Sequence, residues 1–217
     1  KVQIARLIHT ILNECKSLHI VFFNEGLVPI LSDIIRNEKD PRLLTYSIFS
    51  FNHLFKTFEC TNLSYFEDYI SIAILRDSYK RIMQHEATKF TIQFLKGAIV
   101  LSSRISYYQL DDDDSMAAFE LSLWTLVQEK DDIYVYALKT LSYLFENGKI
   151  NFEDFDQSGM YKIVKKRFFS SYPSNKIFSC DIFVSLFKNG YFANYYFDIE
   201  INQILNCIDE NEESEKC

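Results

Sequence analysis

The residue types that could support catalysis or metal binding are few and scattered in this sequence of 217 residues. His85 and Glu86 open like the zinc-protease motif HExxH, but Lys89 stands where the second histidine is required. The four histidines are far apart in the sequence, at His9, His19, His53 and His85. No nucleophile with a base, metal set or phosphate-binding loop is visible. We therefore expect a protein that is not an enzyme and that uses no cofactor or metal.

The cysteines and the apolar segments predict an intracellular chain. The five cysteines are Cys15, Cys60, Cys180, Cys207 and Cys217. Their wide spacing lacks a CxxC or Cys/His metal pattern, which favours free thiols in a reducing compartment. No apolar run reaches the roughly 18 residues of a membrane span, and no signal peptide is visible. We expect a cytoplasmic or nuclear protein that has no membrane partner.

The composition favours a folded, helical and acidic protein. Its hydrophobic content of 48% is typical of a globular fold, and only 5 Gly and 3 Pro supply turns, which favours helices over sheets. The net charge of −7 argues against a general nucleic-acid surface. Much of the acid lies in residues 111–114 and in the tail 209–217, so local basic clusters remain possible.

Apolar residues recur at helical spacing along most of the chain. The N-terminal segment 2–15 is one predicted helix, segment 27–35 is a second, and a third begins at Asp40-Pro41 and continues through Leu54. The further predicted helices are 66–84, 86–103, 116–130, 133–147, 158–169 and 172–190. Residues 191–208 are expected to open another unit or to cap the stack, and the charged tail 209–217 to be frayed.

Segment 25–54 resembles one armadillo repeat. It contains a short helix ending at Gly26, the sequence Leu27-Val28-Pro29-Ile30-Leu31, a polar turn with Asp40-Pro41, and a long helix with Ser47 at its centre. The resemblance implies that Ser47 lies where the helices cross most closely. It also implies an all-α protein, a right-handed α-solenoid of about four to five repeats, which forms one domain over residues 1–208.

The long helices align at a nearly constant period. The aligned positions are His9, Phe49, Gln93, Lys139 and Val184, in steps of 40, 44, 46 and 45 residues. Armadillo and related repeats have periods of roughly 40–47 residues. Each unit is apolar on two sides, so it must stack on neighbours to bury them. The first and last units are expected to be incomplete.

In armadillo proteins, the long helices line a concave groove that binds extended peptides. The resemblance therefore implies a protein-binding groove in this chain, formed by Thr45, Phe49, His53, Gln93, Tyr136, Lys139, Tyr143 and Lys188. The two lysines favour a protein or peptide partner of acidic character. Burial between repeats is the alternative for the aromatic residues, above all for Tyr136.

Nuclear-import adaptors of this family carry a repeated Trp-x-x-x-Asn in the groove. The Trp positions correspond here to His9, Phe49, Gln93, Lys139 and Val184. The Asn positions correspond to Asn13, His53, Gly97, Tyr143 and Lys188. Only Asn13 matches, so a lysine-rich nuclear signal would have nothing to stack on. A divergent peptide receptor of the nuclear-transport type remains an alternative.

Charged clusters offer other candidate sites. A secondary basic patch is predicted from Lys162, Lys165, Lys166 and Arg167, and a similar stripe from Arg76, Lys80 and Arg81. Each is either compensation of a helix dipole or a surface for an acidic partner. For the acidic run 111–114 followed by Ser115, we favour helix capping over a docking tag or a kinase site. Trp124 is expected in the core.

The sequence therefore predicts a non-catalytic module that binds another protein, as a scaffold, an adaptor or a regulatory subunit. The alternative from a different class is a helical-repeat protein that binds nucleic acid. That alternative needs one basic or stacking side chain per repeat along a continuous face, and the net charge of −7 is against it.

Overall fold

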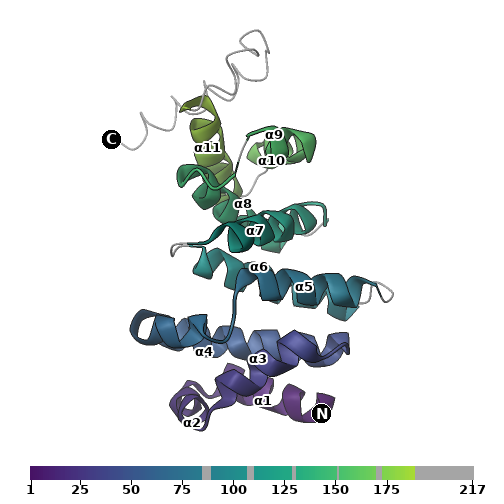
Figure 1. Cartoon of the computed structure of the whole chain (residues 1–217), viewed down its shortest axis with the longest axis vertical. Helices are drawn as coiled ribbons and strands as arrows, with labels where there is room; N and C mark the ends of the chain where they lie inside the picture. The colour runs from purple at the N-terminus through teal and green to yellow at the C-terminus, as the bar shows by residue number, and fades with distance from the viewer. Residues whose placement is uncertain (85–88, 107–109, 129–130, 151, 170–172, 189–217) are drawn as a thin grey trace.

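The protein is all-helical in the computed structural model, which describes residues 1–84, 89–106, 110–128, 131–150, 152–169 and 173–188. No strand occurs in these ranges. Figure 1 shows the helices piled in layers along the longest axis, with the N-terminus at one end and α11 at the other. The prediction of an all-α protein is confirmed.

The helices pack in two columns. They are α1 (Val2–Glu14), the 3-10 helix η1 (Lys16–Leu18), α2 (His19–Asn24), α3 (Leu27–Asn37), α4 (Pro41–Glu67), α5 (Ile72–Met83), α6 (Lys89–Ile105), α7 (Asp112–Leu126), α8 (Asp131–Glu146), α9 (Phe152–Gln157), α10 (Met160–Phe168) and α11 (Pro173–Lys188). In one column α1 packs on α4, α4 on α6, α6 on α8, and α8 on α11. In the other column α3 packs on α5 and α5 on α7, while α10 packs on α9 and α11.

Local sequence signals explain where the helices begin. Gly26 and Gly159 precede α3 and α10 with φ angles of 76° and 72°, a left-handed conformation that glycine adopts without steric cost. The Asp40 carboxylate accepts a hydrogen bond from the Arg42 N–H at 2.9 Å, and Pro41 fits the first turn of α4. The chain therefore turns sharply into each of these helices.

Two predicted boundaries were wrong. The helix predicted over 66–84 begins only at α5, because α4 continues to Glu67 across a break at Asn62 (φ −137°, ψ 31°) and Ser71 caps the next helix. Helix α7 begins four residues before the predicted Met116. The Asp111 carboxylate accepts the Asp114 N–H at 2.8 Å, so the next three aspartates form the first turn instead of a loop.

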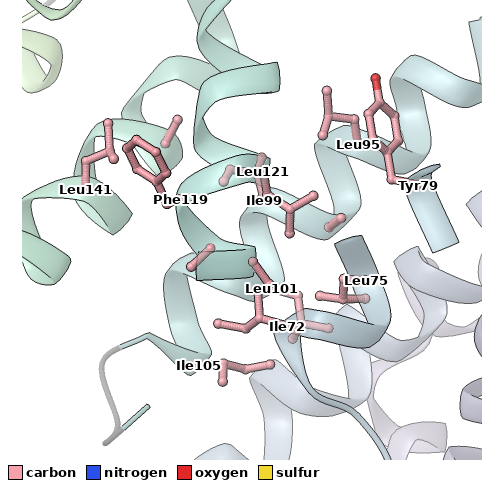
Figure 2. Packing of buried hydrophobic residues seen from close by; sticks show 14 of the residues in the cluster. Ile72, Leu75, Tyr79, Leu95, Ile99, Leu101, Ile105, Phe119, Leu121 and Leu141 are labelled. Atoms are coloured by element: carbon pink, nitrogen blue, oxygen red, sulfur yellow. The ribbon is translucent and has the colours of Figure 1, made fainter. Parts of the chain in front are cut away.

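The apolar side chains between the columns form one continuous buried cluster, from Leu12 in α1 to Leu186 in α11. In the part drawn in Figure 2, α5 contributes Leu75, α6 contributes Ile99, and α7 contributes Phe119 and Leu121. Each layer therefore buries apolar surface against both of its neighbours, which is why no single layer could stay folded alone.

Cross-layer bonds have the same sequence offset between α4 and α6. The Thr45 hydroxyl donates to the Phe90 carbonyl at 2.8 Å, and the Asn52 amide donates to the Gly97 carbonyl at 2.9 Å. The Arg104 guanidinium lies 2.7 Å from the Glu59 carboxylate. All three pairs are 45 residues apart. Helix α6 therefore lies beside α4 with a constant offset of 45 residues, one more than the alignment step of 44 between Phe49 and Gln93.

Side chains from one layer also cap the helix ends of the layer before it. Arg81 of α5 donates to the carbonyls of Ile35, Arg36 and Glu38 at the C-terminal end of α3, at 2.7, 2.6 and 3.1 Å. Asp114 of α7 accepts the Ala73 N–H of α5 at 2.8 Å. A cation at a helix C-terminus and an anion at an N-terminus both complement the helix dipole.

Some predictions fall outside the described residues. These concern the segment 191–208, the tail 209–217, His85, Glu86, Cys207 and Cys217. None of the described helices alone is long and apolar enough to cross a membrane. The helical segments Lys16–Asn24 and Leu27–Asn37, which are bent by 81° relative to each other, are together long and apolar enough for a span by length and composition only.

Candidate functional site

Aromatic rings line the outer face of the first long helices. The His9 ring of α1 lies 5.6 Å from the Phe49 ring and 6.0 Å from the Tyr46 ring of α4. The Tyr46 ring in turn lies 6.3 Å from the Phe90 ring of α6. All four side chains are partly exposed. We call His9, Tyr46, Phe49 and Phe90 the aromatic row.

The predicted groove residues Phe49 and His53 come together on this face, and His9 is the residue that joins them. The His9 ring lies 5.5 Å from the His53 ring. Sequence reasoning used His9 only as an alignment position and did not name Tyr46 or Phe90. The spacing of Tyr46, Phe49 and His53 along α4 could have indicated Tyr46, since residues three and four apart share a helix face.

Thr45 was wrongly assigned to the groove. Its side chain is 3% exposed, and its hydroxyl donates to the carbonyl of Phe90 between α4 and α6. The alignment also placed Gly97 at an outward position, but Gly97 is buried against Ile48 of α4. Ser47, expected where helices cross closely, is completely buried.

The remaining groove residues lie on the later long helices. Gln93 is partly exposed on α6. On α8, Tyr136 and Tyr143 are partly exposed and Lys139 is exposed, and their spacing places them on one helix face. Tyr136 also packs against the core, so the alternative of burial holds for part of its ring. Lys188 is exposed at the end of α11, which packs directly on α8.

Helix α11 carries apolar residues that sequence reasoning missed. Ile177 and Phe187 are 59% and 49% exposed, and helical spacing places both near Val184 and Lys188. The same spacing in the sequence could have found them.

Negative charge accompanies the lysines on these last two helices. Burial raises the pKa of Asp181 on α11, and the nearby carboxylate of Glu146 on α8 raises that pKa further. Exposed Glu146 follows Tyr143 by three residues and Lys139 by seven, so it belongs to their helix face. The surface of α8 and α11 therefore combines apolar side chains with both signs of charge.

Two of the four residues in the secondary basic patch are exposed, and the other two lie near aromatic rings. Lys162 and Lys166 are exposed on α10. The Arg167 guanidinium instead lies 3.5 Å from the centre of the buried Tyr134 ring, and the Lys165 ammonium lies 5.9 Å from the Tyr161 ring. Arg167 is partly exposed and also packs against α8 through this cation–π contact.

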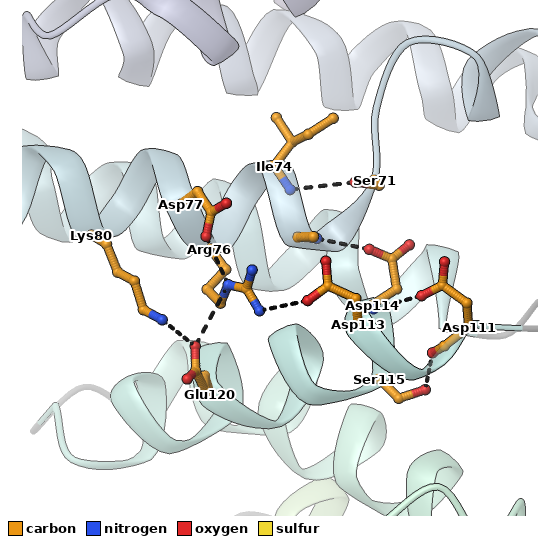
Figure 3. Close-up of polar contacts among 11 residues, drawn as sticks. Ser71, Ile74, Arg76, Asp77, Lys80, Asp111, Asp113, Asp114, Ser115 and Glu120 are labelled. Atoms are coloured by element: carbon orange, nitrogen blue, oxygen red, sulfur yellow. Dashed lines mark hydrogen bonds and ion pairs between the residues drawn. The ribbon is translucent and has the colours of Figure 1, made fainter.

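The second basic stripe is taken up by interactions within the fold. Figure 3 shows Arg76 of α5 between Asp77, Asp113 and Glu120, with closest N–O distances of 2.8, 3.0 and 3.7 Å. Lys80 pairs with Glu120 at 2.8 Å. The pairs with Asp113 and Glu120 connect α5 to α7, as the capping by Arg81 connects α5 to α3.

Metal-ligating side chains and thiols are the remaining candidate groups from the sequence. No group of three His, Cys, Asp or Glu residues in the described part of the chain is arranged to hold a metal ion. Cys15 and Cys60 are exposed free thiols, and Cys180 is half-buried against the core. Trp124 also packs against the core, as predicted, with its ring 5.2 Å from that of Tyr79.

Known proteins provide no assignment for this chain. No protein-family model matches the sequence, and comparisons with curated proteins and with solved structures found no match. The geometry of the long helices therefore has to carry the functional conclusion.

Proposed function

We propose that this chain is a right-handed α-solenoid of four to five armadillo-like repeats that binds an extended segment of a partner protein along its long helices. Three features support the repeat architecture. The long helices contact one another in chain order, the cross-layer bonds of α4 and α6 join residues 45 apart, and a left-handed glycine precedes both α3 and α10. The chain would serve as a scaffold, an adaptor or a regulatory subunit.

The aromatic row is the observation that carries the binding proposal. Its rings belong to three successive long helices and remain partly exposed although they touch one another. Flat rings with few rotatable bonds lose little entropy when a partner covers them, which makes them effective anchors. An extended peptide could follow this row from α1 to α6 and continue towards Lys139 and Lys188.

The state of the basic side chains favours a protein partner over nucleic acid. Arg76, Lys80 and Arg81 are occupied by carboxylates or carbonyls of the fold, and Arg167 packs on Tyr134. These cations would have to leave their partners to bind phosphates. Lys139 and Lys188 remain exposed and favour acidic side chains in the partner.

Selection from a random-peptide display library against the purified protein tests the proposal. We expect enriched peptides with apolar anchors and acidic residues. The double variant Lys139→Glu/Lys188→Glu should bind them about tenfold more weakly and melt normally, because exposed charges contribute little to stability. Phe49→Gln should also weaken binding. Glu146→Lys is the matched control of opposite sign and should not weaken it.

Two results would contradict the proposed surface. One is a library that yields no binder. The other is a set of peptides whose affinity is unchanged in both the lysine variant and Phe49→Gln. If Lys162→Glu/Lys166→Glu then abolished binding, the exposed part of the secondary basic patch would be the working site.

A further inference from the structure

Three histidines that are distant in the sequence meet where the first layer docks on α4. The first layer consists of α1, η1 and α2. His9 lies on α1, His19 is the first residue of α2, and His53 lies on α4. The His53 ring is 5.5 Å from that of His9 and 6.2 Å from that of His19. The contact between the first layer and α4 therefore passes through three imidazole rings.

His19 connects all three helices. It is 4% exposed, and its Nε2–H donates to the Leu12 carbonyl in the last turn of α1 at 2.7 Å. Its Nδ1 lies 2.6 Å from the Thr57 hydroxyl of α4, which also lies 2.9 Å from the His53 carbonyl. His19 therefore acts as the fixed centre of the junction, with a polar partner at each ring nitrogen.

His9 and His53 lack such compensation. Burial lowers the pKa of His9, and its Nδ1 is buried without a hydrogen-bond partner. Burial is also the main cause that lowers the pKa of His53, and the charges of His9, His19 and Lys56 lower that pKa further. A proton on either ring would place positive charge in a partly buried site, and at His53 that charge would also lie near His9, His19 and Lys56.

The carboxylates of the surrounding helices are committed elsewhere or exposed. Glu59 of α4 pairs with Arg104 of α6 at 2.7 Å, and Glu38 beyond α3 pairs with Lys1 at 2.7 Å. Glu14 of α1 is exposed and accepts from the Asn13 amide. The other charged groups of these elements are Arg6 on α1, Lys16 on η1, Glu25 after α2, Asp33 and Arg36 on α3, Arg42, Lys56 and Glu67 on α4, and Lys89 and Lys96 on α6.

We infer that His9 and His53 form a pH-sensitive latch that holds the first layer against α4 at neutral pH and releases it on acidification. The docked state favours the neutral form of both rings, whereas both accept protons more readily once the layer opens. The native pKa values are lowered, so docking is fully favourable above the unfolded value of about 6.5. The stabilisation is lost as the pH falls from that value through the lower native values.

Release would also change the proposed binding surface, because His9 contributes to the aromatic row. This consequence rests on the proposed function, whereas the latch itself does not. Acidification would remove His9 from beside Phe49 and uncover the side of α4 that α1 covers. The latch would thus couple partner binding to pH.

Native-state hydrogen exchange tests the latch on the whole chain. After correction for intrinsic exchange rates, we expect the opening constant of α1 and α2 to rise below about pH 6.5, with a net uptake of protons by His9 and His53. His9→Phe/His53→Phe keeps ring contacts without titration and should remove this uptake, while each single variant should remove part of it. His9→Gln/His53→Gln serves as a second variant in case the bulkier phenylalanine rings disturb packing. It should reduce the proton uptake in the same way.

Histidine Cε1–H NMR titrations provide the second readout, in which native His9 and His53 should titrate below their unfolded values. An uptake near zero in the unchanged chain would overturn the latch, and so would an undiminished uptake in both double variants. Peptide binding at pH 7.5 is measured separately. Absence of peptide binding at pH 7.5 would contradict the proposed function but not the latch. Opening of the first layer that does not depend on pH would contradict the latch but not the proposed function.

Discussion

The close approach of α4 and α6 at Gly97 can be tested by adding a single methyl group. A Cβ built at Gly97 would lie 2.7 Å from Cγ2 and 3.1 Å from Cγ1 of Ile48. Both atoms branch directly from the Ile48 Cβ, so they cannot swing away like the end of a flexible side chain. Ile48 is also completely buried. Gly97→Ala should therefore push the two helices apart.

Two opposing effects set the magnitude. Alanine is favoured over glycine inside a helix by about 1 kcal/mol. Overpacking in a filled core costs roughly 1–3 kcal/mol, and here the carbonyl of Gly97 must also keep its bond from Asn52. The difference is a net loss of up to about 2 kcal/mol. In a chain of this size, that loss lowers the melting temperature by up to roughly 8 °C.

A double-mutant cycle with Ile48→Ala isolates the steric cause. Ile48→Ala alone should cost about 2–5 kcal/mol, because it leaves a cavity. In that background the clashing atoms are gone, so Gly97→Ala should become stabilising by up to about 1 kcal/mol. Urea unfolding of the four proteins measures each step. If Gly97→Ala destabilises both backgrounds equally, Ile48 is not the obstacle and the reasoning is refuted.

Further changes test the bonds between layers. Arg81→Met keeps the apolar stem but leaves carbonyls at the end of α3 without their donors. Urea unfolding should therefore show that the free energy of unfolding falls by roughly 2–4 kcal/mol. An unchanged unfolding midpoint would contradict this capping role. Asp114→Ala should cost about 1–2 kcal/mol, because the Ala73 N–H loses its acceptor, whereas Asp114→Asn can still accept and should cost less. Burial raises the pKa of Asp114. The free energy of unfolding of the unchanged protein should therefore fall slightly as the pH rises from the unfolded pKa of Asp114 through its higher native pKa. Asp114→Asn should abolish this fall.

The sequence alone determined the helical class and much of the register. Helical periodicity is a local property, and caps such as Asp40-Pro41 and Gly159 act through the backbone of their own turn. For α4 and α6, the alignment step of 44 residues differs by only one from the offset of 45 that their bonds show. The boundary before α5 failed because the break at Asn62 carries no glycine or proline that would mark it.

The tertiary structure decided which helix faces remain accessible. Spacing placed Thr45 and Phe49 on neighbouring parts of one helix surface, but only the position of α6 buries Thr45 and leaves Phe49 partly open. Likewise, helical spacing does not distinguish Arg167 from its exposed neighbours on α10, and only the tertiary structure places its guanidinium over the Tyr134 ring of α8. The meeting of His9, His19 and His53 depends on how the first layer docks on α4. A helix pattern specifies directions around its own axis, whereas burial depends on the neighbour that lies in each direction.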